Sequence, residues 1–241
     1  MRVWLFDFDG TLSPLVADRN AAVIHPACAG MLGELSRSTT DQVAIISSRA
    51  LEDLLPRIPL KDIIIGGNSG IEWQLPGGCR ISLGTNKKDI LEARRRELMP
   101  LLEKLGRQSG IEIEDKQWSV AIHVEKSGKA ATERITKTID DWAQRQKIAL
   151  HHGPNVLEVQ FLDGFDKSVG ATFLASLLKI DTTKDSIFYA GDDENDAVAM
   201  RWAIESGGTA IMVGSRLDVP CALYVDDQLA LVQTVEKLRS S

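Results

Sequence analysis

The sequence has few cysteines, and their arrangement serves no recognisable chemistry. Its 241 residues include three, Cys28, Cys79 and Cys221, which are widely spaced. An odd number without a CxxC pair argues against a disulfide framework and against a cysteine-based metal or redox site. We expect all three to be packing residues in a reducing compartment.

Long runs of one residue type are also missing. No basic run exceeds three residues and the formal net charge is −6, so the broad basic surface that binds a nucleic-acid backbone is absent. No segment approaches the roughly 18 uninterrupted apolar residues of a membrane span. The first apolar run ends at Asp7, too early for a signal peptide. We therefore expect a cytoplasmic protein with neither a nucleic-acid nor a membrane partner.

Short apolar runs alternate with helical patterns along most of the chain. The runs are residues 3–6, 43–46, 63–65, 187–190 and 210–213, and the helical patterns include 27–36, 167–178 and 195–206. Continuous apolar runs suit strands buried on both faces. Their alternation with helices predicts an α/β core, a doubly wound, Rossmann-like parallel sheet with its site at the carboxyl ends of the strands.

The pattern changes between residues 85 and 163. Two apolar stripes at helical spacing appear there, and segments 118–124 and 156–161 alternate apolar and polar residues like strands with one packed face. We expect an inserted α+β cap domain at 85–163, which interrupts a catalytic core made of residues 1–84 and 164–241.

Two carboxylates end the first expected strand. Asp7 and Asp9 follow residues 3–6 and precede Gly10, which permits a sharp turn. In an extended chain a spacing of two points both side chains to the same side. One carboxylate can then act as nucleophile and metal ligand while the other transfers a proton.

A second acidic cluster, Asp192, Asp193 and Asp196, follows the expected strand 187–190. Taken alone, it is also consistent with a solvated loop or a helix cap. If the two strands are neighbours, the carboxylates of both clusters repel one another unless a cation neutralises them. An all-oxygen cluster suits Mg²⁺, which we expect as the cofactor.

Two residues elsewhere suit a phosphate group. Ser47 follows the run 43–46, where its hydroxyl can donate to a phosphoryl oxygen. Lys167 precedes a helical stretch, and both a cation and a helix N-terminus favour a bound anion.

These pieces resemble a known family. Asp7-Phe8-Asp9-Gly10-Thr11, Ser47, Lys167 and Gly191-Asp192-Asp193 with Asp196 are similar, in this order, to the four motifs of the haloacid dehalogenase superfamily of phosphohydrolases. Within it the chain most resembles the trehalose-6-phosphate phosphatases, which carry an α/β cap between the second and third motifs.

The resemblance implies roles for the core residues. Asp7 would attack phosphorus and form an aspartyl-phosphate, and Asp9 would protonate the leaving sugar oxygen and then activate water. Asp7, the backbone carbonyl of Asp9, and Asp192 would hold Mg²⁺. Asp193 or Asp196 would support the metal's waters or Lys167, and Ser47 and Lys167 would bind the phosphoryl oxygens.

The same resemblance implies a set of substrate-binding residues. In the cap they are Glu114, Lys116 and Glu158, together with Ser119 and His123, and in the core Arg49 and Asn68. Alternation independently places Glu114 and Lys116 on one strand face, and Ser119 and His123 on the polar face of another.

Three functions remain open at this point. The leading one is Mg²⁺-dependent hydrolysis of trehalose-6-phosphate, in functional pairing with a sugar-phosphate synthase. The second is the same chemistry on glucosylglycerol phosphate, mannosylglycerate phosphate or sucrose phosphate. The third is a catalytically silent sugar-phosphate sensor, against which the complete set of catalytic residues argues.

Overall fold

The computed structural model describes residues 1–83, 85–107, 110–124, 128–148, 150–153, 156–214 and 217–240. They form two compact units, Met1–Ile81 with Asp166–Ser241, and Ser82–Phe165. The expected insert, residues 85–163, falls within the second unit. Gly84, at the expected boundary, lies outside the described residues.

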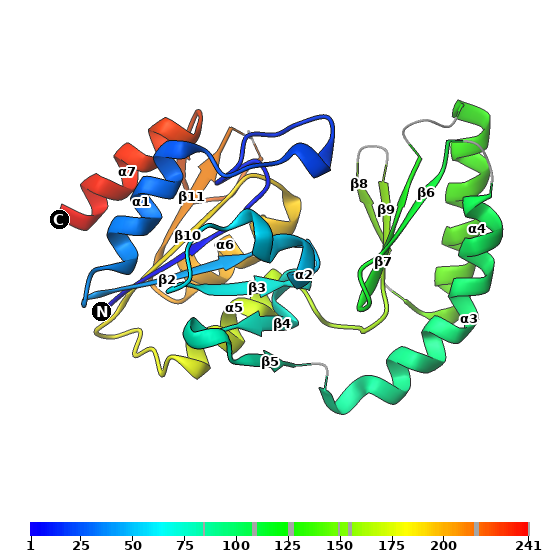
Figure 1. Cartoon of the computed structure of the whole chain (residues 1–241), viewed down its shortest axis with the longest axis horizontal. Coiled ribbons are helices and arrows are strands. Elements are labelled where there is room, and N and C mark those ends of the chain that lie inside the picture. Colours follow the sequence, from blue (N-terminus) through cyan, green and yellow to red (C-terminus); the bar gives the residue numbers. More distant parts are fainter. Residues whose placement is uncertain are drawn as a thin grey trace. The chain divides into compact units, whose positions relative to one another are not determined.

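The larger unit is built on an eight-stranded sheet in the order β12-β11-β10-β1-β2-β3-β4-β5. Neighbours from β12 to β3 run parallel, and β4 runs antiparallel to β3. Figure 1 shows β10 beside β1, although they are far apart in sequence. The strands are β1 (Arg2–Phe6), β2 (Asp41–Ile46), β3 (Ile64–Gly67), β4 (Glu72–Gln74), β5 (Arg80–Ser82), β10 (Ser186–Gly191), β11 (Thr209–Val213) and β12 (Leu223–Val225).

Helices cover both faces of this sheet, as the continuous apolar runs require. On one face α1 (Pro26–Ser36) and α7 (Gln228–Ser240) lie side by side (Figure 1) over a cluster that includes Trp4 and Phe6 of β1. Alternation sends Val3 and Leu5 to the other face, where α5 (Lys167–Leu177) and α6 (Glu194–Glu205) pack. The predicted doubly wound α/β core is confirmed. Shorter elements are α2 (Leu51–Leu54) and 3-10 turns at Arg19–Ala21, Leu55–Arg57, Asn68–Gly70, Pro76–Gly78 and Thr85–Lys87.

The second unit is an antiparallel sheet with one helix-covered face. Its order is β6-β7-β9-β8. The buried face carries Val120, Ile122, Leu157 and Val159, and α4 contributes buried residues such as Ile139. The elements are α3 (Lys88–Gly106), β6 (Glu112–Asp115), β7 (Ser119–His123), α4 (Lys129–Gln146), β8 (Leu150–Gly153) and β9 (Val156–Gln160). This confirms the predicted α+β insert. Within the described part of the chain, no helix combines the length and apolar character needed to cross a membrane.

Asp41 joins three elements of the larger unit. Its carboxylate accepts hydrogen bonds from Arg2 Nε at 2.7 Å, Trp4 Nε1 at 3.0 Å and Arg239 Nε at 3.2 Å, so β1, β2 and α7 meet on one buried anion. Burial alone would raise the pKa of Asp41, but the hydrogen bonds from Trp4 and Arg2 lower it below its usual range.

Replacing Asp41 with alanine should therefore destabilise the fold by about 2 kcal/mol at pH 7, because buried donors lose their acceptor. A lowered folded-state pKa gives stability that is present above the unfolded pKa of about 4 and lost as the pH falls through the folded value. Urea denaturation of both proteins at pH 7 and near pH 3 measures this. A difference of equal size at both pH values would contradict it.

Candidate active site

Three carboxylates and one ammonium group converge at the carboxyl ends of β1 and β10. Lys167 Nζ lies 2.7 Å from Asp7 Oδ1 and 2.7 Å from Asp196 Oδ1. The backbone N–H of Asp7 donates to the carbonyl of Ala190, which brings the acidic segment after β10 alongside the end of β1. One carboxylate oxygen each from Asp7, Asp192 and Asp196 lies within 4.8 Å of the others.

Two helix N-termini fix these side chains. Asp166 caps α5 by accepting from the N–H groups of Ser168 and Val169, and this holds Lys167 at the first helical position. Asp193 caps α6 in a reciprocal capping box with Asp196. The helix starts at Glu194, one residue before the expected start, and it is Asp193 that caps it.

Tyr189 adds a hydrogen bond that the sequence analysis missed. It lies on β10, and its hydroxyl donates to Asp196 Oδ1 at 2.7 Å. Asp196 is completely buried and accepts from both Lys167 and Tyr189. Strand alternation was the available signal, because it places Tyr189 on the face covered by α6.

The cluster holds more negative charge than Lys167 neutralises. Burial, and next the charge of Asp196, raise the pKa of Asp7 well above its usual value despite Lys167. Burial, followed by Asp196 and Asp193, raises the pKa of Asp192 to about 8. Burial alone would lower the pKa of Lys167, but the carboxylates of Asp196 and Asp7 raise it instead. Crowded carboxylate oxygens with excess negative charge fit a hard divalent cation such as Mg²⁺.

Gly10 leaves room for the carboxylate of Asp192. Its φ of +79° belongs to the left-handed region, and a Cβ built there would lie 2.0 Å from Asp192 Oδ2. A side chain at position 10 would therefore displace a carboxylate of the cluster as well as strain the turn.

The carboxylate of Asp9 is bound by a different cation. Arg49 donates to it from Nε at 2.6 Å and from Nη2 at 2.7 Å, a bidentate pair. Arg49 was expected to bind substrate, but it is directed at Asp9 and at Asp53, which accepts from Nη1 at 2.7 Å.

The remaining expected core residues follow the next two strands of the sheet, β2 and β3. Ser47 follows β2, and its Oγ accepts from the backbone N–H of Arg49 at 3.2 Å. Asn68 follows β3 and donates from Nδ2 to Glu72. Among the described residues, Asn68 Oδ1 and Thr11 Oγ1 are buried without a hydrogen-bond partner. Buried polar atoms without a partner require an explanation, and a ligand bound at this edge of the sheet would supply one.

The second unit holds the expected cap residues on one face of its sheet. Lys116 Nζ and Ser119 Oγ both donate to Glu158 Oε1, at 3.2 and 2.8 Å. His123 Nε2 lies 3.1 Å from Glu114 Oε2. Ala121 on β7 pairs with Glu114 on one side and Glu158 on the other, so a small side chain separates two acidic ones. The five residues thus form two polar clusters on one surface.

Comparison with known proteins decides the family. Residues 5–216 match the family model described as trehalose-phosphatase. The chain belongs to the trehalose-phosphatase family. The trehalose-phosphate phosphatase of Mycobacterium ulcerans is 29% identical over 211 residues, covering 86% of this chain and 53% of that protein. The chain therefore spans about half the length of this curated relative.

Solved structures support the trehalose-phosphatase assignment at the level of the fold. The trehalose-6-phosphate phosphatase C-terminal domain of Candida albicans has a TM-score of 0.81 at 19% identity, over 99% of this chain and 92% of that one. The trehalose synthase regulatory protein C-terminal domain of the same organism gives 0.75 at 17% identity, over 96% and 92%. A haloacid dehalogenase-like hydrolase from Bacteroides thetaiotaomicron gives 0.70 at 15% identity, over 98% and 99%. These likenesses confirm the predicted fold.

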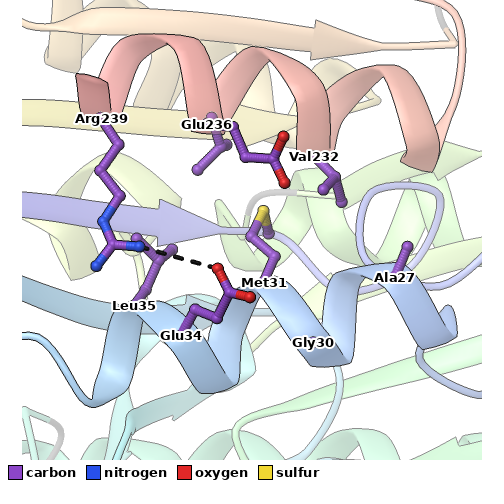
Figure 2. Close-up of a pocket in the computed structure, with 9 residues that line it drawn as sticks. Ala27, Gly30, Met31, Glu34, Leu35, Val232, Glu236 and Arg239 are labelled. Carbon is purple, nitrogen blue, oxygen red and sulfur yellow. Dashed lines mark ion pairs between the residues drawn. The ribbon is translucent and has the colours of Figure 1, made fainter. Parts of the chain in front are cut away.

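A cavity elsewhere in the larger unit is separate from this candidate site. It lies between α1 and α7 and has a volume of about 140 Å³ (Figure 2). Met31, Leu35 and Val232 are among its lining residues, and Arg239 and Glu34 approach to 4.0 Å at its edge. None of its lining residues belongs to the expected site.

Proposed function

We propose that this chain is a Mg²⁺-dependent phosphatase that hydrolyses trehalose-6-phosphate to trehalose and phosphate. The observation that carries the proposal is the buried Asp7 carboxylate, held by Lys167 within 4.8 Å of the carboxylates of Asp192 and Asp196. Membership of the trehalose-phosphatase family supports the choice of substrate.

The reaction proceeds in two steps, transfer of the phosphoryl group to Asp7 and hydrolysis of the aspartyl-phosphate. A carboxylate oxygen of Asp7 forms a bond to phosphorus while the bond from phosphorus to the sugar oxygen breaks, and that oxygen takes a proton from Asp9. In the second step Asp9 takes a proton from water as the water oxygen attacks phosphorus. The bond from phosphorus to Asp7 then breaks, which releases phosphate and restores the carboxylate.

Lys167 and Ser47 stabilise the negative charge that develops on the phosphoryl group. Lys167 presents a fixed ammonium beside Asp7, and Ser47 offers a hydroxyl at the end of the next strand. Donors fixed before the reaction begins stabilise the developing charge most effectively, because they need no reorganisation. Asp196 and Tyr189 keep Lys167 in place by completing its buried surroundings.

The residues present suit Mg²⁺. Asp7, Asp192 and the backbone carbonyl of Asp9 would hold it, with Asp193 and Asp196 supporting its waters or Lys167. When bound, the ion neutralises the phosphate and the crowded carboxylates together.

Sugar selection belongs to the second unit, which we propose acts as a cap with the bounds 85–163. Glu158 receives two hydrogen bonds and Glu114 pairs with His123, so carboxylates and their donors line one sheet face. Such groups suit sugar hydroxyls, which both donate and accept. In the core, Asn68 Oδ1 supplies a further buried acceptor.

A phosphate-release panel tests the function. Purified protein with Mg²⁺ should release phosphate fastest from trehalose-6-phosphate, and chelation should abolish release until Mg²⁺ is restored. Faster turnover of glucosylglycerol phosphate, mannosylglycerate phosphate or sucrose phosphate would reassign the substrate. Binding of these esters without release of phosphate from any would establish a sensor instead.

Replacing Glu158 with glutamine should raise KM for trehalose-6-phosphate about tenfold and leave kcat within about twofold, since sugar binding is lost while the reacting groups remain. Turnover of p-nitrophenyl phosphate, which has no sugar, should stay unchanged. Glu133 lies on α4, away from the polar sheet face, and Glu133→Gln is the matched control. Equal losses on both esters would contradict a sugar-binding role.

We also propose a functional pairing with a sugar-phosphate synthase. The substrate must come from an enzyme that joins a sugar to a sugar phosphate. Coupled assays of the two enzymes should release phosphate at the rate at which the synthase delivers the ester. Failure to consume the synthase product would contradict the pairing.

A further inference from the structure

We infer that Arg49 is a positioning residue for Asp9, and that Asp53 is the anchor that holds Arg49 in place. The inference rests on the proposed function, because it concerns the residue assigned there as general acid and base. It adds Asp53 to the residues on which catalysis depends and gives Arg49 a role other than substrate binding.

The guanidinium of Arg49 is almost fully engaged by protein oxygens. Of its five N–H donors, Nε and one on Nη2 reach Asp9, the second on Nη2 reaches the carbonyl of Arg19 at 2.7 Å, and one on Nη1 reaches Asp53. The ring of Phe8 lies 5.7 Å from the guanidinium carbon. The side chain is only 8% exposed, so little of Arg49 remains for a ligand.

Asp53 is fixed in turn by a second arginine. Arg57 Nη2 donates to Asp53 Oδ1 at 2.8 Å, while Arg49 Nη1 donates to Oδ2. Burial alone would raise the pKa of Asp53, but hydrogen bonds from Arg57 and Arg49 lower it, so the anchor is anionic at neutral pH. Arg57 also donates to the carbonyl of Ala22 at 2.9 Å. Acidic and basic side chains therefore alternate along Asp9, Arg49, Asp53 and Arg57.

This arrangement leaves Asp9 able to react. A carboxylate has about four lone-pair sites, and the bidentate pair with Arg49 uses two of them. The side chain of Asp9 is 36% exposed, whereas that of Arg49 is buried. Arg49 thus holds one edge of the carboxylate and leaves the other edge open to the leaving oxygen or to water. A misplaced acid or base loses rate steeply, so a rigid holder increases kcat.

The test compares two esters that differ in their need for an acid. Trehalose-6-phosphate has a poor leaving group that must be protonated, whereas p-nitrophenyl phosphate leaves without a proton. Arg49→Lys keeps the charge but cannot form the bidentate fork. We expect it to lower kcat/KM about 30-fold for trehalose-6-phosphate, through kcat, and less than about threefold for the aryl ester. Asp53→Asn should show the same contrast at about fivefold.

Glu52→Gln is the matched control. Glu52 adjoins Asp53 on α2, its side chain is 73% exposed, and it pairs with Arg80 rather than with Arg49. Glu52→Gln should leave the turnover of both esters unchanged. Circular dichroism melting should show that Arg49→Lys, Asp53→Asn and Glu52→Gln all fold.

The alternatives give different results. A rise in KM without loss of kcat in Arg49→Lys would make Arg49 a substrate ligand and overturn the inference. Equal losses of kcat/KM on both esters would show a merely structural role and also overturn it, because kcat/KM reports the first step, in which only the sugar ester needs a proton from Asp9. A faster kcat would show that Arg49 restrains Asp9 rather than positions it. Asp9→Asn is measured in parallel, and a full rate there would refute the acid–base role of Asp9 on which the inference rests. Failure of the unsubstituted protein to release phosphate from trehalose-6-phosphate would refute the proposed function itself.

Discussion

Replacing Asp7 with asparagine is expected to lower kcat about 10⁴-fold or more, because an amide cannot attack phosphorus. The fold should survive the change. Asparagine has nearly the same shape as aspartate, and the change removes one negative charge from a crowded group of carboxylates. Lys167 keeps its second partner, Asp196, in the variant. Phosphate release from trehalose-6-phosphate, followed over a long incubation, measures the loss.

Asp62→Asn provides the matched control for this experiment. Asp62 is an exposed aspartate of the same unit, so the identical change there should affect neither rate nor melting temperature. Residual turnover in Asp7→Asn above about 1% of the normal rate would show that Asp7 is not the nucleophile.

Replacing Lys167 with methionine should affect both rate and stability. Its side chain is 3% exposed and its ammonium pairs with two buried carboxylates, so its loss removes stabilisation of the transition state and leaves those carboxylates without a cation. We expect kcat to fall about 10²- to 10³-fold and the free energy of unfolding to fall by about 3 kcal/mol. Phosphate release and urea denaturation measure the two effects separately.

A second substitution separates the two roles of Lys167. In the Lys167→Met/Asp196→Asn double variant, one unpaired carboxylate is gone, so most of the stability should return while activity stays low. Tyr189 can still donate to the asparagine oxygen at position 196. Recovery of activity together with stability would mean that Lys167 serves the fold and not the reaction.

The elements that could be predicted are those with a strong hydrophobic signal. The sequence segments that form β1, β2, β10 and β11 are apolar because both faces of those strands are buried. β12 escaped prediction because Leu223 and Tyr224 are 41% and 51% exposed at the sheet edge. The strands β4 and β5 have three residues each, too few to show a period. α7 did carry a signal, since the buried Leu231 and Val235 are four apart.

The site, like the fold, could be predicted only where the sequence carries a clear signal. Acidic residues after two strands predicted where the carboxylates would gather, because parallel strands end at one edge. The link between Arg49 and Asp53 was visible as a spacing of four. The link between Arg49 and Asp9 was not, because β1 and α2 meet only through the tertiary structure. Which carboxylate a given arginine or lysine binds likewise depends on side-chain geometry, which the spacing of residues in the sequence does not specify.

The division of the chain into two units has an evolutionary consequence. Asp7, Ser47, Lys167 and Asp192 all belong to the unit Met1–Ile81 with Asp166–Ser241, and the proposed sugar-selecting residues of the insert belong to Ser82–Phe165. Substitutions in the insert can therefore accumulate without disturbing the buried charges around the nucleophile. A descendant of this chain could acquire a new sugar ester by drift in one segment while inheriting its chemistry unchanged in the other.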